Sequence, residues 1–347
     1  MKIAVMTSWN ADTGAAVHSK SLVDAWRKKE HEVTVFSFLR SEFKEYEFTG
    51  KDERFVVRCL GTAKKNLLDP RPILSSEFDL FLVENLRMFP VKELAKIFPL
   101  IAARSRTVHI FHENEMPKES WFYQFTWDKV VYFDKRQDFL TEVYPDAEYI
   151  PFPCFPVRRG DKQESRKRLG LPPDKKIIFV FCQRGYQPYL RYLSEGLENK
   201  AILLFVTYPN SEMLEVESPP SWMIVREEGA LSEDRFDDYL FASDAVIFHK
   251  FQSRYYRVAS SVIFKAIGAG CPIFLPQQSE FFRPFKDEAV YYSNSEELNK
   301  KLLALFKDDK KARRVAEAAE VFARMNSADR IADIYIELFT RILKEGR

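Results

Sequence analysis

Two hydrophobic periodicities alternate along most of the chain. Short apolar runs rich in β-branched residues are typical of buried strands, and the longer segments between them carry apolar residues at helical spacing. Residues 2–6 predict a strand, residues 17–29 an amphipathic helix and residues 31–38 a second strand. A strand, a helix and a strand in this order form a βαβ unit with parallel strands. The chain therefore begins as an α/β domain.

The same alternation continues to about residue 150. An amphipathic helix is expected at residues 91–104. Further strands are expected at residues 55–60, 79–85, 107–112 and 129–133. Residues 151–175 are rich in proline and charge, which indicates a linker followed by a short helix at 165–171. This break predicts a boundary between two domains, as the length of 347 residues also favours.

A second α/β series begins at residue 176. Strands are expected at residues 176–181, 201–207, 222–227, 244–250, 271–276 and 289–293. Helices are expected at residues 189–197, 232–243, 260–270 and from 295 onwards, ending in a strongly amphipathic helix at 328–346. Ser232 is the expected N-cap of one helix, and Gly270 the C-terminal glycine of another. We therefore expect two Rossmann-like, doubly wound domains that face each other across a cleft.

Composition and charge exclude several classes of function. The chain is 46% hydrophobic and 30% charged with a net charge of +2, which argues against general nucleic-acid binding. No apolar run reaches 18 residues and no signal peptide is recognisable, so a cytoplasmic protein is expected. The four cysteines are far apart, which favours buried free thiols over disulfides or a zinc site: Cys59, Cys154, Cys182 and Cys271.

Candidate site residues follow from the rule that open α/β sheets bind ligands at the carboxyl ends of their strands. In the first domain, the loop at residues 8–16 contains Gly14, which lets a ligand approach a helix N-terminus. His112 ends another strand and could bond a polar substrate or move a proton. An ordinary βα turn and a structural histidine are the alternatives to these two interpretations.

The second domain offers cations and hydroxyls for an anion. Arg184 follows the strand at residues 176–181, and Arg191 comes shortly after it. Farther on, Ser260 and Ser261 open a helix whose first amides would be free, with Arg257 and Lys265 nearby; the four together suit a diphosphate. A surface arginine and a simple serine cap remain the alternatives.

Several segments match known sequence motifs in order. EHEV at residues 30–33 is similar to a GHEV motif, with Glu30 in place of the glycine, and IPFP at 150–153 is similar to IPNG. FKAIGAGCPIF at 264–274 is similar to EAMAxGxPVV. Together with residues 327–343, which are similar to a pair of closing helices, these segments resemble the GT-B fold glycosyltransferases, especially the retaining family 4.

The resemblance implies transfer of a sugar from a nucleotide-diphosphate donor, UDP- or GDP-linked, with retention at the anomeric carbon and with neither cofactor nor metal. It implies an acceptor-side domain at residues 1–155 and a donor-binding domain at 156–327, with the helix at about 328–347 packed back onto the first. Gly14 would lie near the diphosphate and His112 would contact the donor sugar. The family has a phosphate-binding basic residue after the first strand of its second domain, and Arg184 matches it best. The residues themselves add five further donor-site candidates: Arg191, Arg257, Ser260, Ser261 and Lys265.

One departure from the family leaves other functions open. The glutamates of the E-x7-E motif are replaced by Arg257 and Lys265, and a lysine cannot accept the ribose hydrogen bond that the second glutamate accepts. An inactive relative that only binds a sugar nucleotide or a glycan is therefore the alternative. A UDP-sugar epimerase of the same fold, using Glu113 or Glu115, is a further option.

The acceptor is left open by the sequence: a sugar, a polyol or a lipid-linked sugar would each fit. Exposed basic and aromatic side chains could touch a membrane surface, although solvated loops are the simpler interpretation. The candidates for this peripheral contact are Lys64, Lys65, Trp121 and Phe122.

Overall fold

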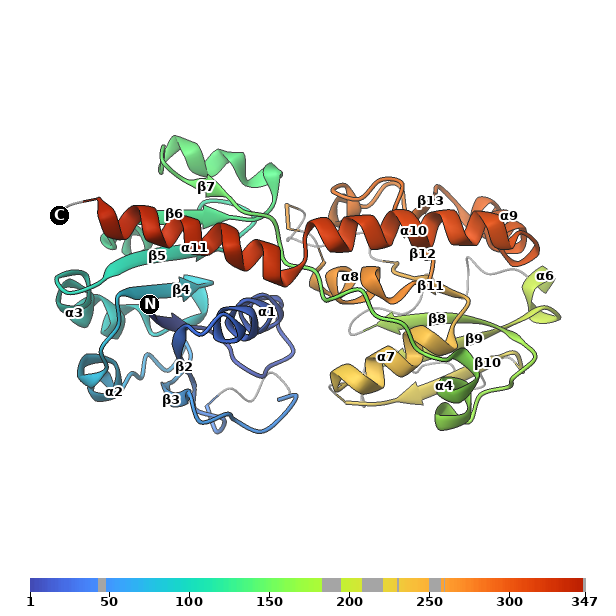
Figure 1. Cartoon of the computed structure of the whole chain (residues 1–347), viewed down its shortest axis with the longest axis horizontal. Helices are drawn as coiled ribbons and strands as arrows, with labels where there is room; N and C mark the ends of the chain where they lie inside the picture. The colour runs from blue at the N-terminus through green and yellow to red at the C-terminus, as the bar shows by residue number, and fades with distance from the viewer. Residues whose placement is uncertain are drawn as a thin grey trace. The chain divides into compact units, whose positions relative to one another are not determined.

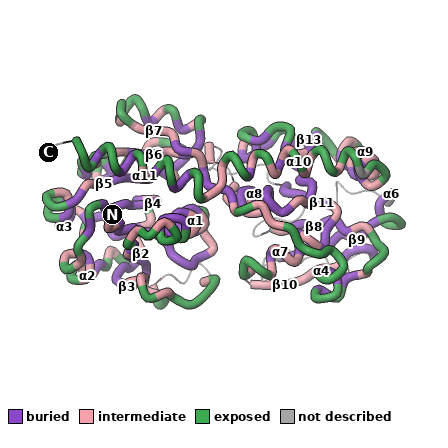
Figure 2. Tube along the Cα trace, viewed as in Figure 1, coloured by how far each residue is buried: buried purple, intermediate pink, exposed green. Residues whose placement is uncertain are grey.

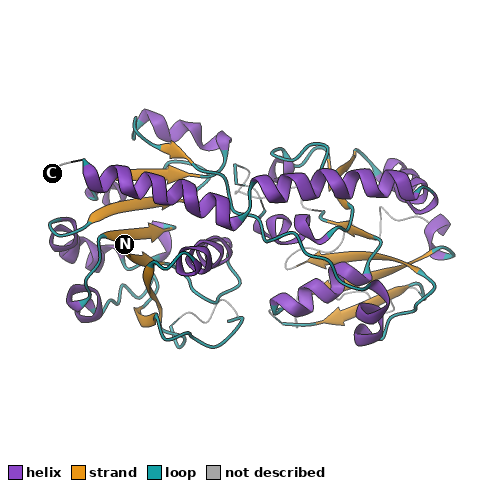
Figure 3. Ribbon diagram, viewed as in Figure 1, coloured by secondary structure: helices purple, strands orange, loops and turns teal. Residues whose placement is uncertain are grey.

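A computed structural model describes residues 1–42, 48–182, 195–207, 221–229, 231–249, 257–258 and 260–345. The chain divides into two compact units, each with its own sheet (Figures 1 and 3). The first unit comprises Met1–Pro153 together with Asn326–Arg347, and the second comprises Cys154–Met325. The sequence predicts domain boundaries after residues 155 and about 327.

The first unit is built on a parallel sheet in the order β3-β2-β1-β4-β5-β6-β7. Its strands are β1 Lys2–Met6, β2 Glu32–Phe38, β3 Val56–Leu60, β4 Leu80–Glu84, β5 Arg106–Phe111, β6 Lys129–Tyr132 and β7 Glu148–Tyr149. The short β7 was not expected from the sequence. Every pairing is parallel, as the βαβ pattern requires. The order of the strands reverses between β1 and β4, which is the switch point of this sheet.

The helices of the first unit cover this sheet. They are α1 Gly14–Lys28, α2 Pro70–Ser75, α3 Val91–Ala102 and α11 Ala328–Lys344, with 3₁₀ turns η1 Leu86–Met88, η2 Ser120–Gln124 and η3 Lys135–Glu142. Helix α1 begins three residues earlier than expected because the Thr13 side chain accepts a hydrogen bond from the amide of Ala16 and caps the helix at Gly14. Helix α11 packs against α1, and Figure 2 shows its buried and exposed positions alternating.

The second unit has a parallel sheet in the order β10-β9-β8-β11-β12-β13. Its strands are β8 Lys176–Cys182, β9 Ala201–Thr207, β10 Met223–Glu227, β11 Ala245–Ile247, β12 Ile273–Pro276 and β13 Val290–Tyr292. All of its pairings are parallel as well. Strand β11 is shorter than the seven residues expected. The order reverses between β8 and β11, which places the second switch point there.

Two capping signals that the sequence predicts, at Ser232 and at Gly270, are present in the second unit. They are α4 Lys162–Leu169, α6 Glu195–Glu198, α7 Glu233–Ala242, α8 Ser261–Ala266, α9 Ser295–Lys307 and α10 Asp309–Met325, with 3₁₀ turns η4 Ile267–Ala269 and η5 Glu280–Phe282. The Ser232 hydroxyl accepts a hydrogen bond from the amide of Arg235, which confirms it as an N-cap. Gly270 has a left-handed φ of 74°, as expected of a glycine that ends a helix. The single helix expected at 260–270 divides into α8 and η4.

Three other expectations concern a helix, the cysteines and membrane-spanning segments. The expected helix at residues 189–197 lies mostly outside the described residues. Cys59, Cys154 and Cys271 are buried free thiols, as expected. No helix among the described residues is long and apolar enough to cross a membrane.

The proposed membrane contact needs one correction. Phe122, a residue of η2, is fully buried because its ring packs against those of His109 and Phe111, so it cannot contact a membrane surface. Trp121 is partly buried beside it. Lys64 and Lys65 are exposed, as that interpretation requires.

Candidate functional site

The first unit places one carboxyl side chain and one imidazole side chain at the switch point of its sheet. Glu84 is the last residue of β4, which pairs with β1 on one side and with β5 on the other. His112 directly follows β5, so both residues stand at the carboxyl edge where ligands of such sheets bind. His18 comes from α1, the helix that follows β1, and lies one turn after Gly14.

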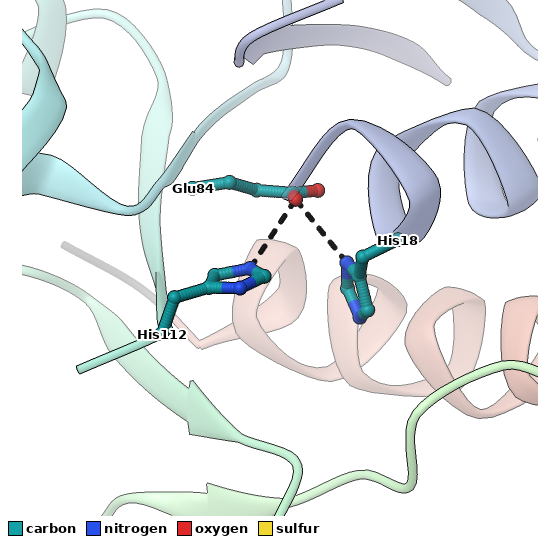
Figure 4. A group of neighbouring side chains, drawn as sticks. All are labelled: His18, Glu84 and His112. Atoms are coloured by element: carbon teal, nitrogen blue, oxygen red, sulfur yellow. Dashed lines mark ion pairs between the residues drawn. The ribbon is translucent and has the colours of Figure 1, made fainter. Parts of the chain in front are cut away.

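These three side chains converge on one carboxylate oxygen (Figure 4). The Oε2 atom of Glu84 lies 3.2 Å from Nδ1 of His18 and 3.4 Å from Nε2 of His112. The side chains of His18 and Glu84 are fully buried, and that of His112 is 7% exposed. Sequence reasoning identified His112 but missed both of its partners.

Burial dominates the electrostatics of this cluster. Burial lowers the pKa of His18 to about 3, so this imidazole is neutral. Burial also lowers the pKa of His112, although the nearby carboxyl group of Glu84 opposes the effect. Burial raises the pKa of Glu84, and its contact with His112 only partly offsets that rise. The cluster therefore holds neutral imidazoles beside a carboxyl group that water does not solvate.

An aromatic shell encloses the two histidines. The His18 ring lies 5.0 Å from Phe152 and 5.6 Å from Phe133, and the His112 ring lies 4.8 Å from Phe133. Phe152 is one of the two residues that replace the Asn-Gly pair of the IPNG segment. Its ring therefore accounts for part of the burial that shifts these pKa values.

Glu113 and Glu115, the carboxylates of the epimerase option, differ in environment. Glu113 is buried, and its Oε2 accepts a hydrogen bond of 3.0 Å from the amide of His112. Burial raises the pKa of Glu113 to about 7, whereas Glu115 is exposed. Glu113 is thus the one of the two that could exchange a proton near neutral pH.

The start of α1 holds a set of hydroxyl groups. Gly14 is the exposed first residue of this helix, with the Thr13 cap before it. The hydroxyls of Ser8 and Thr13 are 2.6 Å apart, and those of Thr7 and Ser19 are 2.9 Å apart. The expected βα turn is present, and its hydroxyls are occupied with one another.

The predicted donor site of the second unit is described in part. Arg184 and Arg191 lie outside the described residues. Ser260 is the N-cap of α8 and makes no capping hydrogen bond through its side chain, and Ser261 is the first residue of the helix. Lys265 is in the last turn of α8, with its Nζ 5.4 Å from the centre of the Phe155 ring. Arg257, three residues before the N-cap, is partly buried.

Sequence reasoning also missed His249 in the second unit. It follows β11 at the switch point, is buried, and its Nδ1 contacts the hydroxyl of Tyr292. Burial lowers the pKa of His249 to about 4, so it is neutral. A histidine at the end of a strand was the signal that selected His112, and the same signal was available here.

Comparisons with known proteins agree with this architecture. A family model described as glycosyl transferase-like matches residues 220–335. The sucrose-phosphate synthase of Thermosynechococcus elongatus is similar over 100% of both chains, with 10% identity and a TM-score of 0.72. A glycosyltransferase from Rickettsia africae is similar over 99% of both chains, with 13% identity and a TM-score of 0.69.

A third solved structure is an alpha-glucosyltransferase in complex with UDP. It covers 99% of this chain and 100% of its own, with 12% identity and a TM-score of 0.65. The chain therefore has the GT-B fold, two Rossmann-like units, and its residues 220–335 match a glycosyl transferase-like family model.

Proposed function

We propose that this chain is a glycosyltransferase that transfers a sugar from a nucleotide-diphosphate sugar to an acceptor, with retention at the anomeric carbon. One observation carries the proposal: the region that matches the glycosyl transferase-like model contains four of the candidates for binding the donor. These are Arg257, Ser260, Ser261 and Lys265. The GT-B fold supports the same conclusion.

The reaction requires positive charge near the leaving group. The bond between the anomeric carbon and the diphosphate oxygen breaks, and its electron pair leaves with the nucleoside diphosphate. The acceptor oxygen bonds the anomeric carbon, and its proton passes to the departing diphosphate oxygen. Cations and backbone amides stabilise the departing charge, and we assign this role to Lys265 and the amide of Ser261, helped by Arg184 and Arg191. No metal or cofactor is needed in this scheme, and the donor is UDP- or GDP-linked.

In the first unit, we assign to His112 the contact with the donor sugar. Its position at the carboxyl end of a central strand supports this role. The acceptor is a sugar, a polyol or a lipid-linked sugar. The basic, exposed Lys64 and Lys65 are compatible with peripheral contact to a lipid surface. A cytoplasmic location stays a prediction.

One observation favours a second function, a relative that binds a sugar nucleotide or glycan without turning it over. Arg257 and Lys265 occupy the positions at which the family has its two glutamates. Neither side chain can accept a hydrogen bond from a ribose hydroxyl. Binding and turnover therefore need to be measured separately.

The test is a thermal-shift screen with UDP, GDP, ADP and their glucose or mannose conjugates. At one hundred times its dissociation constant, a ligand adds about 2.7 kcal/mol to the stability of the folded state. We expect one nucleotide series to stabilise the chain, and its sugar conjugate to be cleaved in the presence of an acceptor. Binding without cleavage of any conjugate supports the second function, and stabilisation by none of them contradicts both.

Lys265→Glu tests the assigned phosphate contact. Loss of a charged hydrogen bond of about 1.5–3 kcal/mol should weaken binding of the nucleotide roughly 10- to 100-fold. Lys300→Glu is the matched control, because Lys300 is exposed on α9 in the same unit and undergoes the same change of charge. Unchanged affinity in Lys265→Glu would remove Lys265 from the donor site.

A further inference from the structure

The first unit buries three polar side chains that no hydrogen bond satisfies. His18 lies on α1, Glu84 ends β4 and His112 follows β5, and the three side chains face one another (Figure 4). Within the described part of the chain, both carboxylate oxygens of Glu84, both ring nitrogens of His18 and Nε2 of His112 are buried without a hydrogen-bond partner. Such atoms are rare in folded proteins, and together they indicate a site for a small ligand.

Direct contact among these side chains does not satisfy them. Oε2 of Glu84 lies 3.2 Å from Nδ1 of His18 and 3.4 Å from Nε2 of His112, but neither contact has the geometry of a hydrogen bond. In the ranges that the structure describes, no lysine or arginine pairs with Glu84. A negative charge on this carboxyl group would therefore be buried without a full positive charge beside it.

A bridging water molecule does not match the spacing. A water that bonds two polar atoms at about 2.8 Å, with a tetrahedral angle between the bonds, holds those atoms about 4.6 Å apart. The carboxylate oxygen of Glu84 is closer than this to the facing nitrogens of both histidines. A ligand with shorter bonds is needed to lie between atoms at these distances.

A metal ion has bonds of the required length. Zinc binds imidazole nitrogen and carboxylate oxygen at about 2.1 Å, which places tetrahedral ligand atoms about 3.4 Å apart. The two contacts of Glu84, at 3.2 and 3.4 Å, match this spacing. No two of the three ligand atoms are more than 4.8 Å apart, so the two histidine nitrogens would approach by up to about 1.4 Å. No hydrogen bond of these nitrogens opposes that movement.

We propose that His18, Glu84 and His112 bind one zinc ion through Nδ1, a carboxylate oxygen and Nε2, respectively. Two histidines and one glutamate are an established donor set for this ion, and a water molecule can take the fourth position. The ion supplies the positive charge that Glu84 otherwise lacks, and it joins α1 to the ends of β4 and β5. The inference goes beyond the proposed function, because the transfer scheme uses no metal.

Zinc binding is measured on the full chain after removal of metal with a chelator and dialysis against micromolar zinc. We expect the native chain to retain one equivalent and to melt at a higher temperature with zinc than without it. Loss of a contact outside the ligand set typically weakens metal binding 10- to 100-fold, so Glu84→Gln and His18→Gln should each weaken it at least about 100-fold. His31→Gln is the matched control, because Nδ1 of His31 faces the N-terminal amine instead, at 3.4 Å.

Long-range ¹H–¹⁵N NMR locates the ion without any substitution. One equivalent of zinc, added to the metal-free native chain labelled with ¹⁵N at its five histidines, should move the resonances of Nδ1 of His18 and Nε2 of His112. His109 is the internal control on β5, because its Nδ1 lies 3.0 Å from the carbonyl oxygen of Val83. Its resonances should stay where they are.

Three results would each overturn the proposal. The first is a native chain that retains no zinc, and the second is unchanged zinc affinity in folded Glu84→Gln and His18→Gln variants. The third is a zinc-dependent change confined to the other histidines, so the test holds even if neither variant folds. All of these measurements are made without nucleotide or sugar, so their failure is distinguishable from failure of the proposed glycosyl transfer.

Discussion

Asp244→Ala should lower the free energy of unfolding of the second unit by about 3–5 kcal/mol, since it leaves a buried arginine without its carboxylate. Nη2 of Arg166 lies 2.7 Å from Oδ2 of Asp244, and the two side chains are 5% and 9% exposed. The same carboxylate accepts a hydrogen bond from the amide of Ile177, at 2.9 Å. These contacts join α4 to β8 at the residue that precedes β11.

The effect of this substitution should depend on pH. Burial by itself would raise the pKa of Asp244, but the charges of Lys162 and Lys176 and the amide of Ile177 lower it below its usual value. A lowered pKa in the folded state adds stability above the unfolded pKa of about 3.9. That stability is lost as the pH falls through the folded pKa. The difference between the native chain and Asp244→Ala should therefore be constant near neutrality and shrink below about pH 4.

Hydrogen exchange followed by mass spectrometry measures this loss in peptides from α4 and β8. Arg283→Ala is the control, because its pair with Glu280 is exposed and worth about 0–1 kcal/mol. The double variant Arg166→Met with Asp244→Leu should recover much of the lost stability, since it removes both charges. A loss below about 1 kcal/mol in Asp244→Ala would show that the pair does not hold α4.

Trp26→Ala should destabilise the first unit by about 3–5 kcal/mol and release α11. The Trp26 ring is fully buried and lies 5.7 Å from that of Tyr335 and 5.5 Å from that of Phe339, both on α11. Two lysines at the end of α1 also pair with aspartates of α11, but the side chains of these pairs are exposed or half-buried, so the pairs contribute little. The aromatic contacts therefore contribute most of the free energy that keeps α11 packed against α1.

The measurement is again hydrogen exchange, now in peptides of α11, together with limited proteolysis of residues 326–345. Ile334→Ala is the matched control, because Ile334 lies on the same helix and is 37% exposed. We expect that control to change stability by about 0.5 kcal/mol or less. Full protection of α11 in Trp26→Ala would mean that other contacts hold the helix.

The sequence indicated only part of the predicted donor site, and the reason is physical. Ser260 and Ser261 were recognised because a helix start is a local feature, with capping residues next to an apolar helical pattern. Gly270 was recognised for the same reason. The expected single helix at 260–270 nevertheless divides, and no local pattern indicated that division.

The buried partners of His112, in contrast, could not be recognised from local sequence features. Glu84 was interpreted as part of a strand, and His18 as one position of an amphipathic helix, because neither has a local pattern that marks it. They meet His112 only because the sheet has the order β1-β4-β5. Periodicity predicts that strands exist, but the pairing order depends on contacts between distant parts of the chain.

Local residue patterns were enough to predict the alternation of strands and helices, the parallel pairing that βαβ units require, and the ends of several helices, because these depend on neighbouring residues. They could not indicate which strands are adjacent, which histidine is paired with a carboxyl group, or which aromatic rings are buried. Those outcomes follow from burial and strand order, which arise when segments far apart in the sequence pack together.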